Sequence, residues 1–150
     1  MGVAAVRAFL RNHRSVALDT NIFIYQLQSN PRYVNLTHPI FQWLEQPGSR
    51  AVTSTITMTE ILIQPYRDND QDLIDKFSGL LFVYPNLEWI SPNLEIASRA
   101  AEIRARHYLL TPDAVHAATA VDAGATAFLT NDPIFRRITS LEVLILDEYV

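Results

Sequence analysis

The chain has 150 residues, of which 49% are hydrophobic and 19% charged, and it contains no cysteine. These values exclude a disordered chain, a disulfide framework and a thiolate metal site, and they suit one domain in a reducing cytoplasm. The formal net charge of −4 argues against a nucleic-acid partner, which prefers a basic surface. Every basic residue except Lys76 is arginine, however. The planar guanidinium of arginine can donate two hydrogen bonds to one phosphate, which the ammonium of lysine does not match.

The first segment is predicted to be an amphipathic helix. Apolar residues recur at helical spacing from Val3 to Leu10, and the segment carries arginines at positions 7, 11 and 14. The segment is too short and too charged to span a membrane. We therefore predict a helical extension at 1–14 that packs on a domain at 15–150, with no membrane partner. A membrane-surface or targeting segment is the alternative.

Apolar runs of strand length then alternate with helical patterns, which favours an α/β fold with a mainly parallel sheet and helices on both faces. The stretch 87–90 is the alternative to 81–84 as the middle strand. The strand candidates are 16–18, 51–54, 81–84, 126–129 and 142–146. The helical candidates are 21–28, 32–46, 57–64, 70–79, 93–108 and 112–123.

Proline and glycine mark the expected ends of these elements. Pro65 is expected to stop one helix, and Ser78-Gly79 to form a turn before the middle strand. Thr111-Pro112 is expected to start the next helix, with threonine as N-cap and proline in the first helical position. Gly124 has the place of the glycine that follows a helix C-terminus.

Four acids occupy positions beyond the carboxyl ends of the predicted strands, where ligands bind in such folds. Asp19 follows the first strand, and Asp132 follows the strand that ends at Leu129. Glu60 and Asp113 lie in the first turns of two helices. Because the parallel strands end at one edge, we expect the four carboxylates to converge there.

Each acid also has an ordinary structural explanation. Asp19 is a candidate N-cap, and Thr57 to Glu60 fits the S/T-x-x-E capping box. Asp113 complements the positive end of a helix dipole, and Asp132 before a proline suits a turn or a short helix.

Taken together, the four acids predict a metal site. Converging carboxylates repel and raise one another's pKa, which one or two divalent cations would relieve. Oxygen ligands without cysteine favour Mg²⁺ or Mn²⁺ over Zn²⁺. Without these acids, the chain has 16 − 4 = 12 acidic and 12 basic residues, so a metal-loaded site would present positive charge to a phosphate. The predicted supporting residues, which would bond the carboxylates or bound waters, are Thr20, Asn21, Thr130 and Asn131.

Several basic residues near the acids are candidates for contact with a phosphate substrate. Arg104 and Arg106 precede the helix of Asp113, and Arg136 follows Asp132. A solvated charged face explains them equally well. His116 lies three residues after Asp113 on the same helix face, but the small residues around it favour a core histidine over a ligand.

With these residues in place, the chain resembles the PIN-domain ribonucleases and, among them, the VapC-type toxins of toxin–antitoxin pairs. The stretch DTNIFIY (19–25) is similar to the first motif of the family, and TSTITMTEIL (53–62) to the second. LLTPDAVHAATAVDAGATAFLTND (109–132) resembles the third and fourth motifs together. The resemblance covers residues 15–147, and the segment 1–14 is a departure from the family pattern.

This resemblance implies a three-layer α/β/α domain in which Asp19, Glu60, Asp113 and Asp132 bind Mg²⁺ or Mn²⁺. It implies metal-dependent hydrolysis of single-stranded RNA, although nothing in the residues requires a 2′-hydroxyl, so DNA stays open. For VapC-type members it also implies homodimers and a cognate antitoxin protein. The homodimer and the antitoxin partner are expectations from the resemblance alone.

Three other kinds of protein also place acids at this edge of a parallel sheet. An aspartyl-phosphate phosphatase and a phospho-acceptor receiver domain both require a well-placed lysine, and Lys76 lies in an acidic helix. A catalytically silent PIN-like module that binds or scaffolds is the alternative to an enzyme. Such modules usually lack one or more of the acids, and all four are present here.

Overall fold

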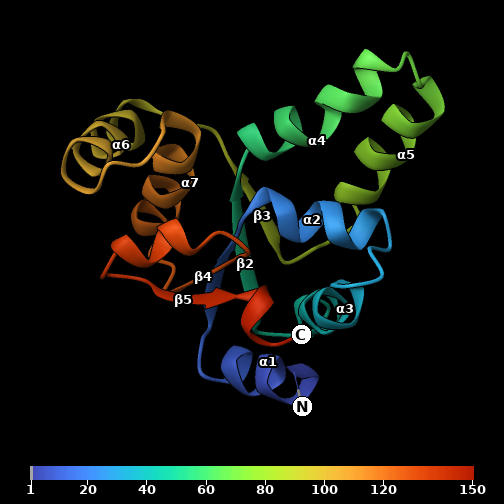
Figure 1. The fold of residues 1–150 in the computed structure, drawn as a ribbon, viewed down its shortest axis with the longest axis horizontal. Helices are drawn as coiled ribbons and strands as arrows, with labels where there is room; N and C mark the ends of the chain where they lie inside the picture. The colour runs from blue at the N-terminus through green and yellow to red at the C-terminus, as the bar shows by residue number, and fades with distance from the viewer. Residues whose placement is uncertain (1) are drawn as a thin grey trace.

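The fold, described for residues 2–150 of a computed structural model, is built on a five-stranded sheet in which all strands are parallel (Figure 1). The strand order is β3-β2-β1-β4-β5, so the chain leaves β1 first to one side and later to the other. This confirms the predicted α/β class with its parallel sheet. The strands are β1 (Ser15–Leu18), β2 (Arg50–Ser54), β3 (Leu87–Ile90), β4 (Ala127–Thr130) and β5 (Glu142–Ile145).

Helices cover both faces of the sheet, which gives three layers. One face carries α1 (Gly2–Arg11), α2 (Thr20–Leu27), α3 (Val34–Leu44), α4 (Ile56–Arg67) and α5 (Gln71–Leu81). The other carries α6 (Leu94–His107), α7 (Thr111–Asp122) and the 3₁₀ helix η1 (Pro133–Arg137). A second 3₁₀ helix, η2 (Leu146–Glu148), follows β5.

The central strand shows why these residues form a doubly covered sheet. Val16 and Leu18 belong to the core on the α2–α3 face, whereas Ala17 belongs to the core on the α6–α7 face. Because side chains alternate along a strand, a strand buried on both faces must be apolar throughout. Val16 lies opposite Ala51 of β2 and Ala127 of β4, so the register aligns small and branched residues across the sheet.

The N-terminal helix α1 packs into the same core as the domain. Its residues Val6 and Leu10 are fully buried with Ile40 and Leu44 of α3. The backbone at Gly2 approaches the carbonyl of Tyr149 so closely that a Cβ would collide with it. The two chain ends therefore lie near each other (Figure 1). Within residues 2–150, no helix combines the length and apolar character that crossing a membrane requires.

The prediction of the middle strand at 81–84 is wrong, and the alternative at 87–90 is confirmed. Helix α5 continues through Gly79 to Leu81, so no turn forms at Ser78-Gly79. Phe77 and Leu81 are both buried and lie four residues apart, which keeps them on one helix face. Their burial offsets the cost of a glycine inside the helix.

Two predicted helix ends also shift. Helix α4 passes Pro65 and ends at Arg67, so only its final turn lies beyond the proline. Two backbone hydrogen bonds hold this turn, from Asp68 N to Gln64 O (2.9 Å) and from Asp70 N to Pro65 O (3.0 Å). Helix α7 begins at Thr111 with Leu110 as its cap, one residue earlier than predicted. Gly124, with a φ of +75°, follows α7 as expected.

Candidate active site

Asp19 lies directly beyond β1, at the point where the strand order reverses. It is the N-cap of α2, with Oδ1 accepting from the backbone N–H of Thr20 (2.8 Å) and Oδ2 accepting from Oγ1 of Thr130 (2.6 Å). The residue is only 7% exposed. Burial raises the pKa of Asp19, and the charge of Glu60 acts in the same direction. The carboxylate is therefore satisfied by hydrogen bonds but held in an environment that disfavours its charge.

Glu60 does not form the predicted capping box. The N-cap of α4 is Thr55, and Oε1 of Glu60 instead accepts from Oγ1 of Thr20 (2.8 Å) and lies 2.6 Å from Nε2 of His116. Burial acts to raise the pKa of Glu60, but the hydrogen bonds from His116 and Thr20 outweigh it and lower the pKa. The capping prediction fails because Glu60 bonds to two other elements rather than to its own helix.

Asp113 and Asp132 complete the set of acids. Asp132 caps η1, with Oδ1 accepting from the backbone N–H of Ile134 (3.0 Å), as one of its structural explanations predicted. Asp113 lies in the first turn of α7 and makes no such cap bond. Burial raises the pKa of Asp113, and the charges of Asp19, Asp132 and Glu60 raise it further.

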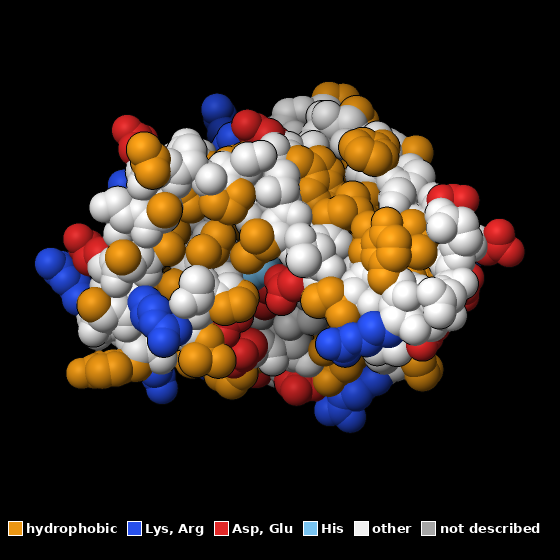
Figure 2. Space-filling view, turned by 90° about the horizontal axis from the view of Figure 1, so that it is seen from above, with side chains coloured by type: hydrophobic (Ala, Val, Ile, Leu, Met, Phe, Trp, Pro, Cys, Tyr) orange, Lys and Arg blue, Asp and Glu red, His pale blue; other side chains and the backbone are white. Residues whose placement is uncertain are grey.

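The four carboxylates line one open pocket of about 470 Å³. Figure 2 shows acidic side chains gathered around a hollow near the middle of the face that carries the strand ends. The remaining lining residues are Thr20, Asn21, Ile24, Ile63 and Gln64. Residues from α2, α4 and α7 and from the loop after β4 thus meet, as expected for the edge of a parallel sheet.

The predicted supporting residues divide into two groups. Thr20 and Asn21 line the pocket, and Thr130 lies buried beneath it with its bond to Asp19. The side chain of Asn21 donates to Asp19 at 3.5 Å, and among residues 2–150 its buried Oδ1 has no hydrogen-bond partner. Asn131 faces elsewhere, accepting from the N–H of Asp147 (2.8 Å) and donating to the hydroxyl of Tyr25 (3.2 Å).

None of the three predicted substrate-binding arginines lines the pocket. Arg104 bonds to Oγ1 of Thr111 (3.2 Å), while Arg106 and Arg136 form exposed ion pairs with Glu102 and Glu148. All three side chains are exposed on α6 and η1.

The donor chemistry of the pocket fits a hard divalent cation. Within residues 2–150, no Lys or Arg nitrogen lies within 4.0 Å of the four carboxylates, and His116 is the one basic side chain that does. In the same part of the chain, no three acid or histidine side chains converge closely enough to enclose a metal ion by themselves. Mg²⁺ usually takes only one or two carboxylates and completes its shell with water and substrate phosphate.

The PIN domain profile matches residues 16–141 of the sequence. The chain belongs to the PIN-domain family. The matched range includes all four acids of the pocket and begins after α1. The predicted membership of this family, inferred from the motifs around the acids, is therefore confirmed.

Several solved structures share the fold at low sequence identity. A chain of VapBC2 from Rickettsia felis, bound to promoter DNA, is 18% identical with a TM-score of 0.70, covering 87% of this chain and 98% of that one. A chain of VapBC-1 from nontypeable Haemophilus influenzae is 24% identical with a TM-score of 0.66, covering 89% of this chain and 98% of that one. A chain of a toxin–antitoxin complex from Klebsiella pneumoniae is 21% identical with a TM-score of 0.62, covering 86% of this chain and 95% of that one. A comparison with curated proteins found no significant match.

Proposed function

We propose that this protein is a metal-dependent endoribonuclease that hydrolyses phosphodiester bonds of single-stranded RNA, and that it is the toxin of a toxin–antitoxin pair. The observation that carries the proposal is the pocket itself. Four carboxylates from separate segments line it, and no lysine or arginine within residues 2–150 neutralises them. Such a cluster at the strand edge of a PIN domain favours a divalent cation over a purely structural role.

Mg²⁺ or Mn²⁺ would be held by oxygens of one or two of the pocket acids Asp19, Glu60, Asp113 and Asp132, with water and substrate phosphate completing its shell. A bound cation polarises a phosphate and promotes ionisation of an attacking water. Asp19 is held in place by Thr20 and Thr130, so its carboxylate is oriented before any ligand arrives. Asp113 is repelled by Asp19, Asp132 and Glu60, and a bound positive charge would relieve this repulsion.

The pocket is open, and its apolar contributions come from Ile24 and Ile63. An open groove can receive an extended strand, in which phosphates are accessible from the side. Arg104, Arg106 and Arg136 are proposed to contact RNA phosphates flanking the pocket. The ion pairs of Arg106 and Arg136 are exposed and contribute little stability, so phosphate can compete for these guanidinium groups.

The partner assignment rests on the structural neighbours. Several solved relatives of this fold are described as toxin–antitoxin complexes or VapBC proteins. We propose that this chain likewise binds a cognate antitoxin protein, forms a homodimer and acts in the cytoplasm. The alternative is a silent PIN-like module, which the complete set of four acids disfavours.

The test is cleavage of a fluorescently labelled single-stranded RNA with Mg²⁺ or Mn²⁺. We expect cleavage by the wild type and a loss on the order of 100-fold or more for Asp19→Asn and Asp113→Asn. Asp72→Asn, which removes an exposed acid of α5, is the matched control and should cleave normally. Single-stranded DNA of the same sequence distinguishes the two substrates. Equal behaviour of all variants would support the silent module.

A further inference from the structure

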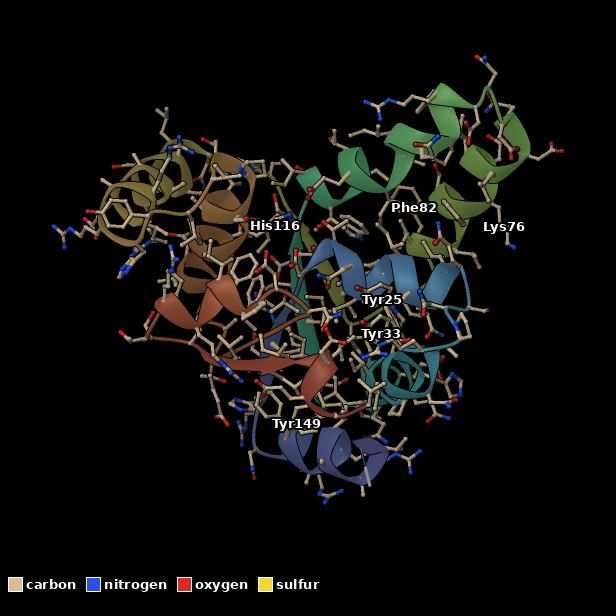
Figure 3. The ribbon with its side chains drawn as sticks, in the orientation of Figure 1. Tyr25, Tyr33, Lys76, Phe82, His116 and Tyr149 are labelled. Atoms are coloured by element: carbon tan, nitrogen blue, oxygen red, sulfur yellow. The ribbon has the colours of Figure 1, made fainter. Side chains whose placement is uncertain are left out.

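His116 is a buried histidine whose side chain reaches the acid pocket. It is 3% exposed and points from α7 toward α4, as Figure 3 shows. Its Nε2 lies 2.6 Å from Oε1 of Glu60, 3.3 Å from Oγ1 of Thr20 and 4.0 Å from Oδ1 of Asp19. The histidine therefore contacts the pocket from beneath rather than from its open side.

The surroundings of His116 explain why it must have a polar partner. Ala117, Ala118 and Ala120 are buried around it on α7, so an imidazole without a hydrogen bond would be costly there. Its short bond goes to Glu60, one of the four acids, across the interface between α7 and α4. Because this partner lines the pocket, the bond connects the buried histidine to the acid cluster.

Glu60 is held from two directions. Thr20, at the start of α2, donates to the same oxygen that contacts His116. Within residues 2–150, the other oxygen, Oε2, makes no hydrogen bond, and the side chain is 37% exposed. Fixing one oxygen restricts the rotation of the carboxylate, so the second oxygen is presented in a narrow range of directions.

We propose that His116 is a positioning residue of the acid pocket, which holds the Glu60 carboxylate through Oε1 so that Oε2 is available to a divalent cation. This inference rests on the proposed nuclease function and adds a residue to it. His116 itself contacts neither the cation nor the RNA. Groups that orient a ligand in this way typically change metal affinity or activity by about 10- to 100-fold when they are removed.

The test compares substitutions that keep or remove the hydrogen-bond donor. His116→Gln retains an N–H donor, whereas His116→Phe keeps an aromatic ring at the position and loses the donor. Mn²⁺ affinity, measured by titration calorimetry without RNA, should weaken about tenfold or more in His116→Phe and much less in His116→Gln. In cleavage assays, His116→Phe should lower kcat and leave the KM for RNA within about twofold. Should the phenylalanine variant not fold, His116→Met against His116→Gln provides the same comparison.

A double substitution decides whether His116 acts through Glu60. In a Glu60→Gln background, His116→Phe should cause little further loss of Mn²⁺ affinity, because the carboxylate that it positions is gone. Additive losses would overturn the proposal. So would equal Mn²⁺ affinity and kcat in wild type and His116→Phe.

His13 provides a matched control. It is also poorly exposed, with Nδ1 2.7 Å from Oγ1 of Thr126, but it lies outside the pocket lining. His13→Phe should leave Mn²⁺ affinity unchanged, and a tenfold loss there would overturn the assignment to His116. If the wild type neither takes up Mn²⁺ nor cleaves RNA, the proposed function fails together with this inference. If the wild type does both and His116→Phe matches it, only this inference fails.

Discussion

Single carboxylates in this protein combine a structural role with a place in the pocket. Asp19 caps α2 and Asp132 caps η1, yet both line the same pocket. A carboxylate has two oxygens and several acceptor sites, so one cap bond does not exhaust it. The structural explanation of an acid is therefore no argument against its binding a cation.

Asp113 should destabilise the metal-free protein at neutral pH. Burial and neighbouring carboxylates raise its pKa, so the folded state binds its proton more readily than the unfolded state does. The free energy of unfolding then falls as pH rises through the interval between the two pKa values, and the deficit is complete above it. We expect Asp113→Asn to raise the melting temperature at pH 7 by on the order of 1–3 °C, a modest gain because Asp113 is half-exposed.

Thermal unfolding with a chelator, followed from pH 4 to pH 8, checks this prediction. The gain should shrink as pH falls toward the ordinary aspartate pKa of 3.8. Asp72→Asn, remote from the pocket, should show no such trend. A gain that is constant with pH, or a loss at pH 7, would contradict the prediction.

Among the helices, α1 lies outside the residues that the PIN domain profile matches, but its side chains are part of the hydrophobic core. Val6 and Leu10 are buried with α3, and the profile match begins only at residue 16. The helix follows from sequence patterning, because its apolar residues recur at helical spacing and arginines occupy the exposed positions. Its packing indicates that α1 and the domain unfold together.

Truncation of Leu10 tests whether α1 contributes to global stability. Leu10→Ala removes a side chain that is 1% exposed and should lower the free energy of unfolding by about 2–5 kcal/mol. Urea unfolding should show a single transition with a lower midpoint. The exposed neighbour variant Arg11→Ala should change stability by less than about 0.5 kcal/mol. A Leu10→Ala variant as stable as wild type would mean that α1 is a dispensable appendage.

For the whole molecule, the net charge hides an uneven distribution. The chain carries −4 overall, but four of its 16 acidic residues line one pocket. The remaining 12 acidic residues balance the 12 basic ones, so the cluster accounts for the entire formal charge. An overall acidic protein can therefore act on RNA if a cation neutralises this one region.

Cation binding should accordingly stabilise the folded protein. At a free Mn²⁺ concentration of about 100 times Kd, mass action adds about 2.7 kcal/mol, which corresponds to a melting temperature roughly 5–10 °C higher. Differential scanning fluorimetry with and without Mn²⁺ measures the shift. Asp19→Asn should lose most of it, and a chelator should reverse it. An unchanged melting temperature in wild type at millimolar Mn²⁺ would contradict the proposed metal site.

Much of the fold could be predicted because the spacing of hydrophobic residues indicates which segments are strands and which are helices. Fully apolar strands such as 16–18 favoured a parallel sheet covered on both faces, and helices between them set the connections. The error at 81–84 arose where the pattern is ambiguous, since Phe82 and Val83 form an apolar run but are 76% and 63% exposed. A short apolar run does not distinguish a strand from a helix end.

The sequence alone determined that four acids lie just beyond strand ends or near the starts of helices, and parallel topology then required them to meet at one edge. Only the tertiary structure decided which side chains touch. Helical periodicity placed His116 on a buried face, but its bond to Glu60 depends on how α7 and α4 pack across the sheet. The same packing turned Asn131 and the arginines away from the pocket. The local sequence pattern determines the order of the helices and strands and which face of each is buried. Contacts between distant segments depend on how these elements pack together when the common core is buried.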